Sequence, residues 1–257
     1  MFVSKSSAHV SPSGNKITFF TNVRAQDNQG HLNGYRIFSV TDTSNFYSNN
    51  PSEWASSRSG DSSYVPMNTS ENLSALFKLS FKLFDGIRFS YLYSKSDDSW
   101  FGYDHGFKYN PDGRAGSYKE TSYSSFQLNH MINPKLFYEL KVSYLDNYTG
   151  NYLFKVPLDF SIADSSNYDH LLITEYDTIP IYHDGNMHEI GDTVYSYVHD
   201  KYLENYGSGF FTGGQQKNHS RLSMIDKTVK FDLNWQANYN HNIKLGLLGI
   251  SHDVDQQ

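Results

Sequence analysis

Residues 228–239 read TVKFDLNWQANY, and their polar and apolar side chains alternate without exception. Apolar residues from Val229 to Tyr239 occupy every odd position, and polar residues occupy every even position. Successive side chains of a β-strand point to opposite faces, so this stretch predicts a strand with one apolar and one polar face. Asn240-His241-Asn242 follows as a turn, and residues 243–247 resume the apolar face in a return strand.

Residues 73–93 repeat this design. Odd positions are apolar from Leu73 to Leu83 and again from Ile87 to Tyr93. Directly paired residues share a face, so Leu83 is expected opposite Ile87. That pairing leaves a three-residue turn, Phe84-Asp85-Gly86, in which Gly86 suits the left-handed position.

Residues 126–144 form a third block of the same kind. Even positions from Phe126 to Ile132 are apolar except His130, and the apolar face returns from Leu136 onward. The three-residue turn Asn133-Pro134-Lys135 is expected between the two strands.

The start of the chain carries a weaker version of the pattern. Residues 17–25 alternate behind the turn Pro12-Ser13-Gly14, and residues 1–11 are a candidate for the strand before that turn. The sequence therefore predicts seven strands of about ten residues and an eighth at the N-terminus.

The composition narrows the class of protein. The 257 residues carry a formal net charge of −6 and no cysteine, which excludes disulfides, thiolate metal sites and a cysteine nucleophile. An acidic chain lacks the basic face that nucleic acid requires, so no nucleic-acid partner is expected. Mean hydropathy is −0.61, and no apolar run is long enough for a membrane-spanning helix. Met1 begins no recognisable secretory signal. The aromatic share of 16% nevertheless favours a folded protein over a disordered one.

Long polar segments separate the predicted hairpins. Residues 26–72, 95–121 and 149–226 each exceed the usual length of a loop in a compact domain. Short turns and long loops alternate, so all short turns lie at one end of the sheet and all long loops at the other. This asymmetry is typical of an all-β, antiparallel, up-and-down outer-membrane β-barrel. The apolar face would then meet lipid, and the polar face, which carries Lys78, Lys230 and Asn234, would line a wet lumen.

The spacing of aromatic residues agrees with a membrane strand. Tyr138 and Tyr148 lie on one face of the same predicted strand. At about 3.3 Å per residue and a tilt of about 40°, they are about 25 Å apart along the membrane normal, which is the height of the apolar band of such barrels. A soluble antiparallel sandwich also alternates, however, and remains the alternative fold.

Three segments carry a family resemblance. They are YVPMN at residues 64–68, the stretch from Asp104-His105 through FKYNPDGR at residues 107–114, and NHMINPKLFYEL at residues 129–140. These segments resemble the barrel region of TonB-dependent outer-membrane receptors, above all the large receptors of Bacteroidetes-type bacteria. The resemblance implies a 22-stranded barrel in the outer membrane with short periplasmic turns and long extracellular loops. An N-terminal plug and a motif that engages the energy-transducing TonB protein precede the barrel in that family.

The length of the chain departs from that plan. At about 32 residues per strand, eight strands amount to about a third of a 22-stranded barrel. Residues 1–257 are therefore expected to be a partial barrel domain, an internal fragment without the plug and the remaining strands.

The resemblance also implies a function and partners. The whole protein would import a nutrient or chelate of the siderophore, vitamin or glycan class, with outer-membrane lipid and the TonB complex as partners. In the glycan-importing branch a surface lipoprotein covers the barrel, and the sequence leaves open whether this chain has one. Two other functions also stay open: a secreted or surface β-rich module whose Tyr-rich loops bind a glycan or protein without transport, and a passive or structural barrel without a plug.

The loops offer only weak candidates for a chemical site. Histidines and carboxylates of the longest loop match no ligand spacing and are best interpreted as a solvated acidic loop: His183, Asp184, His188, Glu189, Asp192, His199 and Asp200. Asp97, Asp98 and Asp104 lack the order of a calcium loop and are best interpreted as surface charge.

Tyrosines and glycines of the loops are weak candidates as well. Five tyrosines could stack on a flat ligand, although aromatic packing among the loops is the simpler interpretation: Tyr103, Tyr109, Tyr118, Tyr202 and Tyr206. Gly207-Ser208-Gly209 and Gly213-Gly214 lack the strand-to-helix context of a phosphate loop. The sequence assigns no catalytic, cofactor or metal residue, predicts no enzyme, and leaves the ligand-binding residues unknown.

Overall fold

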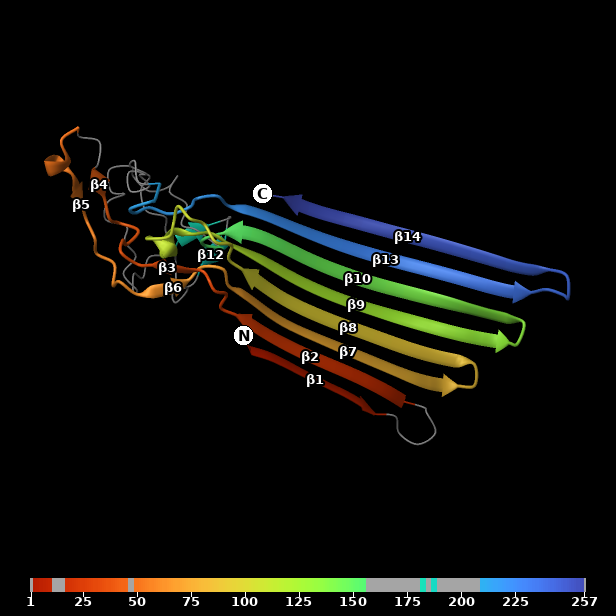
Figure 1. Cartoon of the computed structure of the whole chain (residues 1–257). Coiled ribbons are helices and arrows are strands. Elements are labelled where there is room, and N and C mark those ends of the chain that lie inside the picture. The colour runs from red at the N-terminus through yellow and green to blue at the C-terminus, as the bar shows by residue number, and fades with distance from the viewer. Residues whose placement is uncertain are drawn as a thin grey trace.

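The computed structural model describes residues 2–10, 17–45, 49–155, 181–183, 186–188 and 209–256. Its main feature is one antiparallel sheet of eight strands in the order β1-β2-β7-β8-β9-β10-β13-β14 (Figure 1). The strands are β1 (Phe2–Val10), β2 (Ile17–Asn28), β7 (Ser70–Phe84), β8 (Ile87–Trp100), β9 (Gly116–Asn133), β10 (Leu136–Tyr152), β13 (Ser220–Gln236) and β14 (Asn242–Gln256). Each pairs with the next long strand along the chain, which confirms the predicted all-β, antiparallel, up-and-down arrangement.

Smaller elements lie in the connections at one end of the sheet. β3 (Asn33–Tyr35) pairs with β6 (Tyr64–Pro66), and β4 (Ser44–Asn45) pairs with β5 (Ala55–Ser56). β11 (Ile181–His183) pairs with β12 (Asn186–His188), and two 3₁₀ turns span Pro51–Glu53 and Pro111–Gly113. No helix in the described part of the chain is long and apolar enough to cross a membrane.

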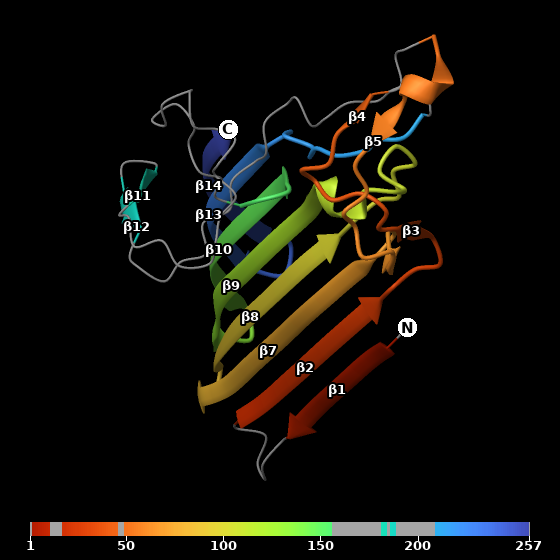
Figure 2. The same cartoon turned by 90° about the vertical axis from the view of Figure 1, so that its left-hand side faces the viewer.

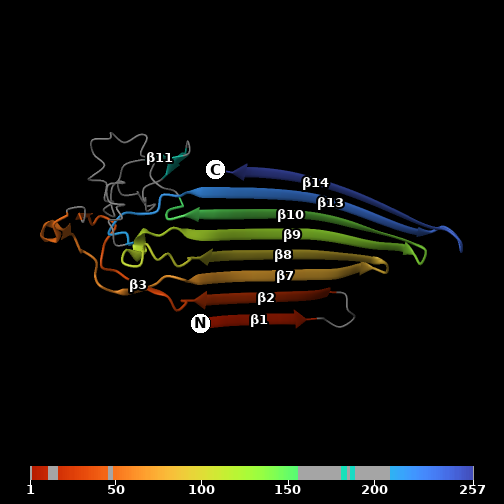
Figure 3. The same ribbon diagram turned by 45° about the horizontal axis from the view of Figure 1, so that its top comes forward.

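The predicted asymmetry of the connections is confirmed. The turns between β7 and β8, between β9 and β10 and between β13 and β14 lie at one end of the sheet, and the long connections lie at the other (Figures 1 and 3). We call these the turn end and the loop end. The predicted eighth strand is also present, because β1 pairs with β2 from Phe2 opposite Asp27 to Val10 opposite Phe19. The predicted turn at Pro12-Ser13-Gly14 lies outside the described residues.

The strands are longer than the ten residues expected from alternation. The six strands from β7 to β14 in the main sheet have 14 to 18 residues each. The extra residues lie at the loop end, so the long connections shrink to residues 29–69, 101–115 and 153–219. These strand ends are polar, so alternation of polar and apolar residues does not predict them. They still form strands, because a ladder of backbone hydrogen bonds does not require apolar side chains.

The turns at the turn end differ in detail from the prediction. Lys82 pairs with Arg88, as the expected register requires, but Phe84 rather than Leu83 lies opposite Ile87. A register shift between Lys82 and Phe84 therefore shortens the turn to two residues. Gly86 adopts the expected left-handed conformation, with φ of 88°.

The turn of the second hairpin is also one residue shorter than predicted. Asn133 rather than Ile132 lies opposite Leu136, again beside a register shift, and the turn is Pro134-Lys135. In the third hairpin, β13 ends at Gln236 opposite Asn242, so residues 237–241 form a five-residue turn. The oxygen Oδ1 of Asn238 accepts hydrogen bonds from the backbone N–H groups of Asn240 and His241 at 2.9 and 3.0 Å. These hydrogen bonds satisfy backbone N–H groups of the turn, so the β13–β14 pairing ends before Tyr239. The side chain of Tyr239 is 98% exposed.

A glycine substitution tests the first turn. A Cβ on Gly86 would lie 2.4 Å from the carbonyl oxygen of Met131, in a backbone conformation that side chains disfavour. We expect Gly86→Ala to lower the free energy of unfolding by about 1–3 kcal/mol. Gly249→Ala is the matched control, because nothing lies within 4 Å of its added Cβ. Urea unfolding of the chain refolded in detergent micelles measures both, and equal midpoints for the two variants would contradict this account of the turn.

The main sheet has one apolar and one polar face, as the alternation predicted. Across the strands, Leu79 pairs with Tyr91, Tyr91 with Phe126, and Phe126 with Val142. The next rung, meaning the set of residues paired directly across the strands, places Ser80, Ser90 and Gln127 on the other side. We call the two sides the apolar face and the polar face.

The sheet is a single curved layer with two open edges. β1 and β14 are its first and last strands, and they do not meet (Figure 2). Closure into the expected barrel is therefore not seen. Among the described residues, the buried hydrophobic side chains are Phe38, Met67, Phe107 and Tyr152, and all four lie at the loop end. The hydrophobic core of the described residues is thus built by the connections and the adjoining end of β10, while both faces of the sheet are open over most of their length.

Candidate ligand-binding loop cluster

Three connections fold together at the loop end into what we call the loop cluster, residues 29–45, 49–69, 101–115 and 209–219. Backbone hydrogen bonds join them pairwise. The N–H of Tyr35 donates to Lys108 O at 2.8 Å, that of Phe211 donates to Gly106 O at 2.7 Å, and that of Gly214 donates to Val40 O at 2.7 Å. Segments far apart in the sequence thereby form one unit at the loop end of the sheet.

The centre of the loop cluster is tightly packed. Met67 and Asn110 are 0% exposed and Phe107 is 1% exposed. The ring of Phe107 lies 4.5 Å from that of Phe211, and the Asn110 side chain donates to Gly214 O at 2.8 Å. The second and third connections therefore share a small core.

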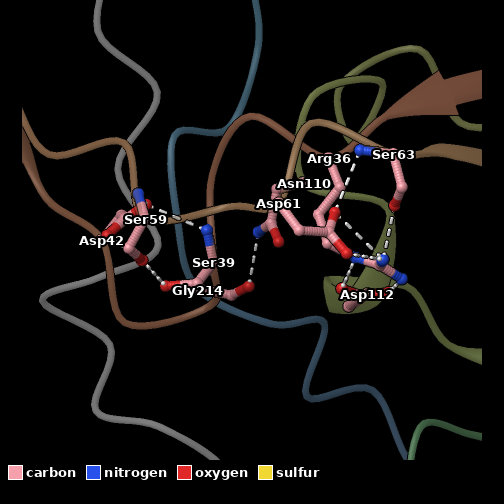
Figure 4. A network of polar contacts seen from close by, with 9 residues as sticks. All are labelled: Arg36, Ser39, Asp42, Ser59, Asp61, Ser63, Asn110, Asp112 and Gly214. Carbon is pink, nitrogen blue, oxygen red and sulfur yellow. Dashed lines mark hydrogen bonds and ion pairs between the residues drawn. The ribbon is translucent and has the colours of Figure 1, made fainter.

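Arg36 joins the first connection to the second through a polar network (Figure 4). Its Nε and Nη2 donate to the two carboxylate oxygens of Asp112 at 2.5 and 2.9 Å, and its Nη1 donates to Asp61 at 3.1 Å and to Ser63 at 2.6 Å. The bond to Asp112 raises the pKa of Arg36 above its ordinary value, and hydrogen bonds from Ser63 lower the pKa of Asp61. A two-pronged pair of this kind fixes geometry as well as contributing energy.

A second polar contact closes the first connection on itself. Asp42 is buried, and its carboxylate accepts from the N–H of Ser39 at 2.9 Å and from the N–H and Oγ of Ser59 at 2.8 Å each (Figure 4). Three hydrogen bonds compensate for its burial, so Asp42 is a structural group.

Arg114 holds the loop cluster against the strand ends. It is buried, and its Nη1 donates to the carbonyl oxygens of Met67 and Gly102. Burial lowers the pKa of Arg114 below its ordinary value, although nearby Asp104 and Asp112 act in the opposite direction. The single cation therefore serves two backbone carbonyls from different connections.

Removing Arg114 tests this role. We expect Arg114→Met to leave two carbonyls without a donor and to lower the local stability of the loop cluster by about 1–3 kcal/mol. Arg58→Met is the control, because Arg58 is an exposed arginine of the same loop cluster. Limited proteolysis should cut the Arg114 variant faster within residues 60–70 and 101–115, and equal cleavage of both variants would contradict the role of Arg114.

The tyrosines of the predicted stacking set pack mainly against other aromatic groups. The hydroxyl of Tyr103 lies 2.9 Å from His105 Nδ1, the ring of Tyr109 lies 4.7 Å from that of Phe210, and that of Tyr118 lies 4.7 Å from that of Tyr152. Tyr202 and Tyr206 lie outside the described residues. The three described tyrosines thus fit the interpretation of packing among the loops.

The carboxylates considered for calcium are not brought together. Asp97 and Asp98 are neighbours in β8 and point to opposite faces of the sheet. Asp98 accepts from Asn72 and from Ser96, whereas Asp104 accepts from the N–H of Gly106 at 2.8 Å and from Gln216 at 3.1 Å. Asp98 and Asp104 thus have separate protein donors, whereas Asp97 forms an ion pair with Lys95 at 3.5 Å.

The histidine candidates fall largely outside the described part of the chain. The backbones of His183 and His188 lie in β11 and β12, while Asp184, Glu189, Asp192, His199 and Asp200 are not described. Among the described residues, no three His, Cys, Asp or Glu side chains gather closely enough to hold a metal ion. Gly207 and Ser208 are likewise not described, and Gly214 serves as a backbone partner for Val40 and Asn110.

Sequence reasoning missed the residues that organise the loop cluster. Arg36, Asp61 and Asp112 are separated by 25 and 76 positions, and no local pattern links them. In the sequence, the stretch Asn110-Pro111-Asp112-Gly113-Arg114 carries only a family resemblance, yet in the structure it supplies the buried side chains of Asn110 and Arg114 and the paired carboxylate of Asp112.

Comparisons with known proteins add no relative: no family model, curated protein or solved structure matches the chain.

Proposed function

We propose that the chain is part of the barrel of a TonB-dependent outer-membrane receptor, which imports a nutrient or chelate across the outer membrane. The observation that carries the proposal is the uncovered apolar face of the main sheet. Large apolar side chains stand exposed on that face over seven strands: Ile17, Val23, Leu73, Phe77, Tyr91, Tyr93, Phe126, Val142, Tyr144, Val229, Trp235, Ile243, Leu245 and Leu247.

Lipid is the surrounding that best suits such a face. A water-soluble sandwich covers its apolar face with a second layer, and monomers seldom expose apolar patches beyond a few hundred Å². In the described residues nothing is packed on the exposed side chains of this face. This disfavours the alternative of a soluble binding module.

The order of residues along each strand of the apolar face is also typical of a membrane strand. On β8 its apolar residues end at Tyr93, and the charged residues Lys95 and Asp97 follow toward the loop end. On β13, apolar residues run from Trp235 to Val229 before Lys227. Tyr93 and Tyr144 therefore mark one margin of the apolar band and Trp235 marks the other, as aromatic girdles do in outer-membrane barrels.

The ends of the sheet suit the two sides of an outer membrane. Short turns are typical of the periplasmic end and long loops of the extracellular end. The loop cluster would then meet ligand first, and the polar face would line the path inward. Residues 1–257 would form part of the barrel domain. The plug, the TonB contact and the remaining strands are implied by the family resemblance alone.

The test uses the full-length gene product of which this chain is part. We expect it to sediment with outer membranes in a density gradient, to need detergent for extraction, and to retain the periplasmic domain of TonB on an affinity column. Recovery as a soluble monomer without detergent would overturn the membrane assignment. Membrane recovery without TonB binding would overturn the transport mechanism and favour a passive barrel.

A further inference from the structure

An exposed indole stands alone at the loop end of the polar face. Trp100 is the last residue of β8 and is 42% exposed. Within the described ranges no ring stacks on it and no group is hydrogen-bonded to its indole N–H. A large aromatic side chain left open on a polar wall has a flat surface and a donor available to a ligand.

The wall around Trp100 consists of short hydroxyl and amide side chains. The rung that contains Trp100 otherwise holds only such groups, namely Asn28, Ser70, Ser117, Asn151 and Ser220. Two residues closer to the turn end, the next rung of the polar face places Gln26, Asn72 and Asp98 side by side. Six strands thus present hydrogen-bonding groups at one height of the polar face.

A shallow depression of about 410 Å³ lies beside Trp100, with Arg24, Gln26, Asn72 and Asp98 in its lining. Its volume falls in the range of small-molecule sites. Asp98 accepts from Asn72 and from Ser96 Oγ at 2.9 Å, and each of its oxygens can accept a further bond. Arg24 uses Nη2 to donate to Gln26 at 2.7 Å and retains other N–H donors.

This combination matches the chemistry of a sugar. A pyranose ring has a face of C–H groups that packs on an indole and a rim of hydroxyls that bonds to carboxylate, amide and guanidinium groups. One cation, Arg24, and two carboxylates, Asp98 and Glu71, line the depression, which therefore favours an uncharged polyhydroxylated ligand over an anionic chelate. We propose that Trp100, with Arg24, Gln26, Asn72 and Asp98, forms a carbohydrate-binding subsite.

The assignment narrows the proposed function from nutrients in general to oligosaccharides. It rests on that function for the claim that the polar face lines an import path. The binding chemistry belongs to the described residues alone. Trp100 would act as the stacking platform, and Asp98 and Asn72 would select the orientation of the hydroxyls.

The experiment measures sugar binding by the full chain refolded in detergent micelles. A glycan array of plant and bacterial oligosaccharides is the probe, and calorimetry with the best-bound oligosaccharide follows. We expect Trp100→Ala to raise Kd by about tenfold or more, as for an aromatic hot spot, and Trp100→Phe to raise it less. Asp98→Asn should also weaken binding, whereas Trp235→Ala, which removes an exposed indole from the apolar face near the turn end, should not.

Two outcomes would overturn the subsite: no glycan bound by the wild-type chain, or equal affinity of the wild type and Trp100→Ala. Circular dichroism and heat-dependent gel mobility establish that each variant is folded. Insertion of the same samples into lipid vesicles separates the two proposals. A chain that inserts but binds no glycan would overturn the subsite alone, and a chain that binds glycan but stays soluble would overturn the membrane function alone.

Discussion

Leu233→Arg is expected to block insertion of the sheet into membranes, whereas Asn234→Arg is expected to be tolerated. Leu233 lies on the apolar face, between Tyr138 of β10 and Leu245 of β14. If that face meets lipid, an arginine at position 233, between the Trp235 margin and the membrane midplane, costs up to about 2–4 kcal/mol. Asn234 is the adjacent residue on the polar face, so its substitution changes the same charge at the same depth.

Vesicle insertion provides the measurement for this pair. The fraction of chain protected from urea after folding into vesicles should fall strongly for Leu233→Arg and remain near the wild-type value for Asn234→Arg. The pair shares strand, depth and charge, so only the face distinguishes its members. Equal loss at both positions would show that the two faces do not divide lipid from water.

Phe107→Ala is expected to unravel the loop cluster while leaving the sheet folded. Phe107 is 1% exposed and packs on Phe211 from another connection. Truncation of a buried phenylalanine typically costs about 3–5 kcal/mol, because a cavity remains where the ring was. The main sheet has its own ladder of hydrogen bonds and shares little packing with this small core, so the loss should stay local.

Hydrogen–deuterium exchange resolves where that stability is lost. Peptides within residues 101–115 and 209–219 should exchange faster in Phe107→Ala, and peptides from β9 and β13 should not. Tyr64→Ala serves as the control, because Tyr64 belongs to the same loop cluster but is 77% exposed. Unchanged exchange in the loop peptides, or faster exchange throughout the sheet, would contradict a separate loop core.

The strands were predictable because their signal is local. Alternation with period two places Leu79, Phe126 and Phe231 on one face wherever the strands pair, and the structure has that register. The exact turns were not predictable from parity, because the register shifts beside Leu83 and Ile132 arise from turn geometry. Alternation in the sequence also continues to Tyr239, although β13 ends at Gln236. Beyond that residue, the side chain of Asn238 accepts a hydrogen bond within the turn.

The loop cluster and the polar wall depend on distant pairings. Arg114 reaches the carbonyl of Met67, and Asn110 reaches Gly214 across 104 positions. The sequence alone does not assign Trp100 to a ligand site, because a tryptophan at a strand end also occurs in hydrophobic cores and in aromatic girdles. Only the register, which places it among Ser70, Ser117 and Asp98, gives it a chemical setting.

Alternation alone could not distinguish a sandwich from a membrane sheet, because both have one apolar face. The structure adds that the described residues leave this face uncovered. A site-by-site measurement of the environment along one strand therefore tests the central claim most directly.

The chain has no cysteine, so single cysteines can be introduced from Lys227 to Trp235 along β13 and labelled with an environment-sensitive fluorophore. In vesicles, we predict quenching by nitroxide lipids at odd positions from Val229 to Trp235 and quenching by aqueous iodide at even positions. Iodide quenching at every position, or no alternation between neighbouring residues, would contradict the lipid-facing assignment of the apolar face.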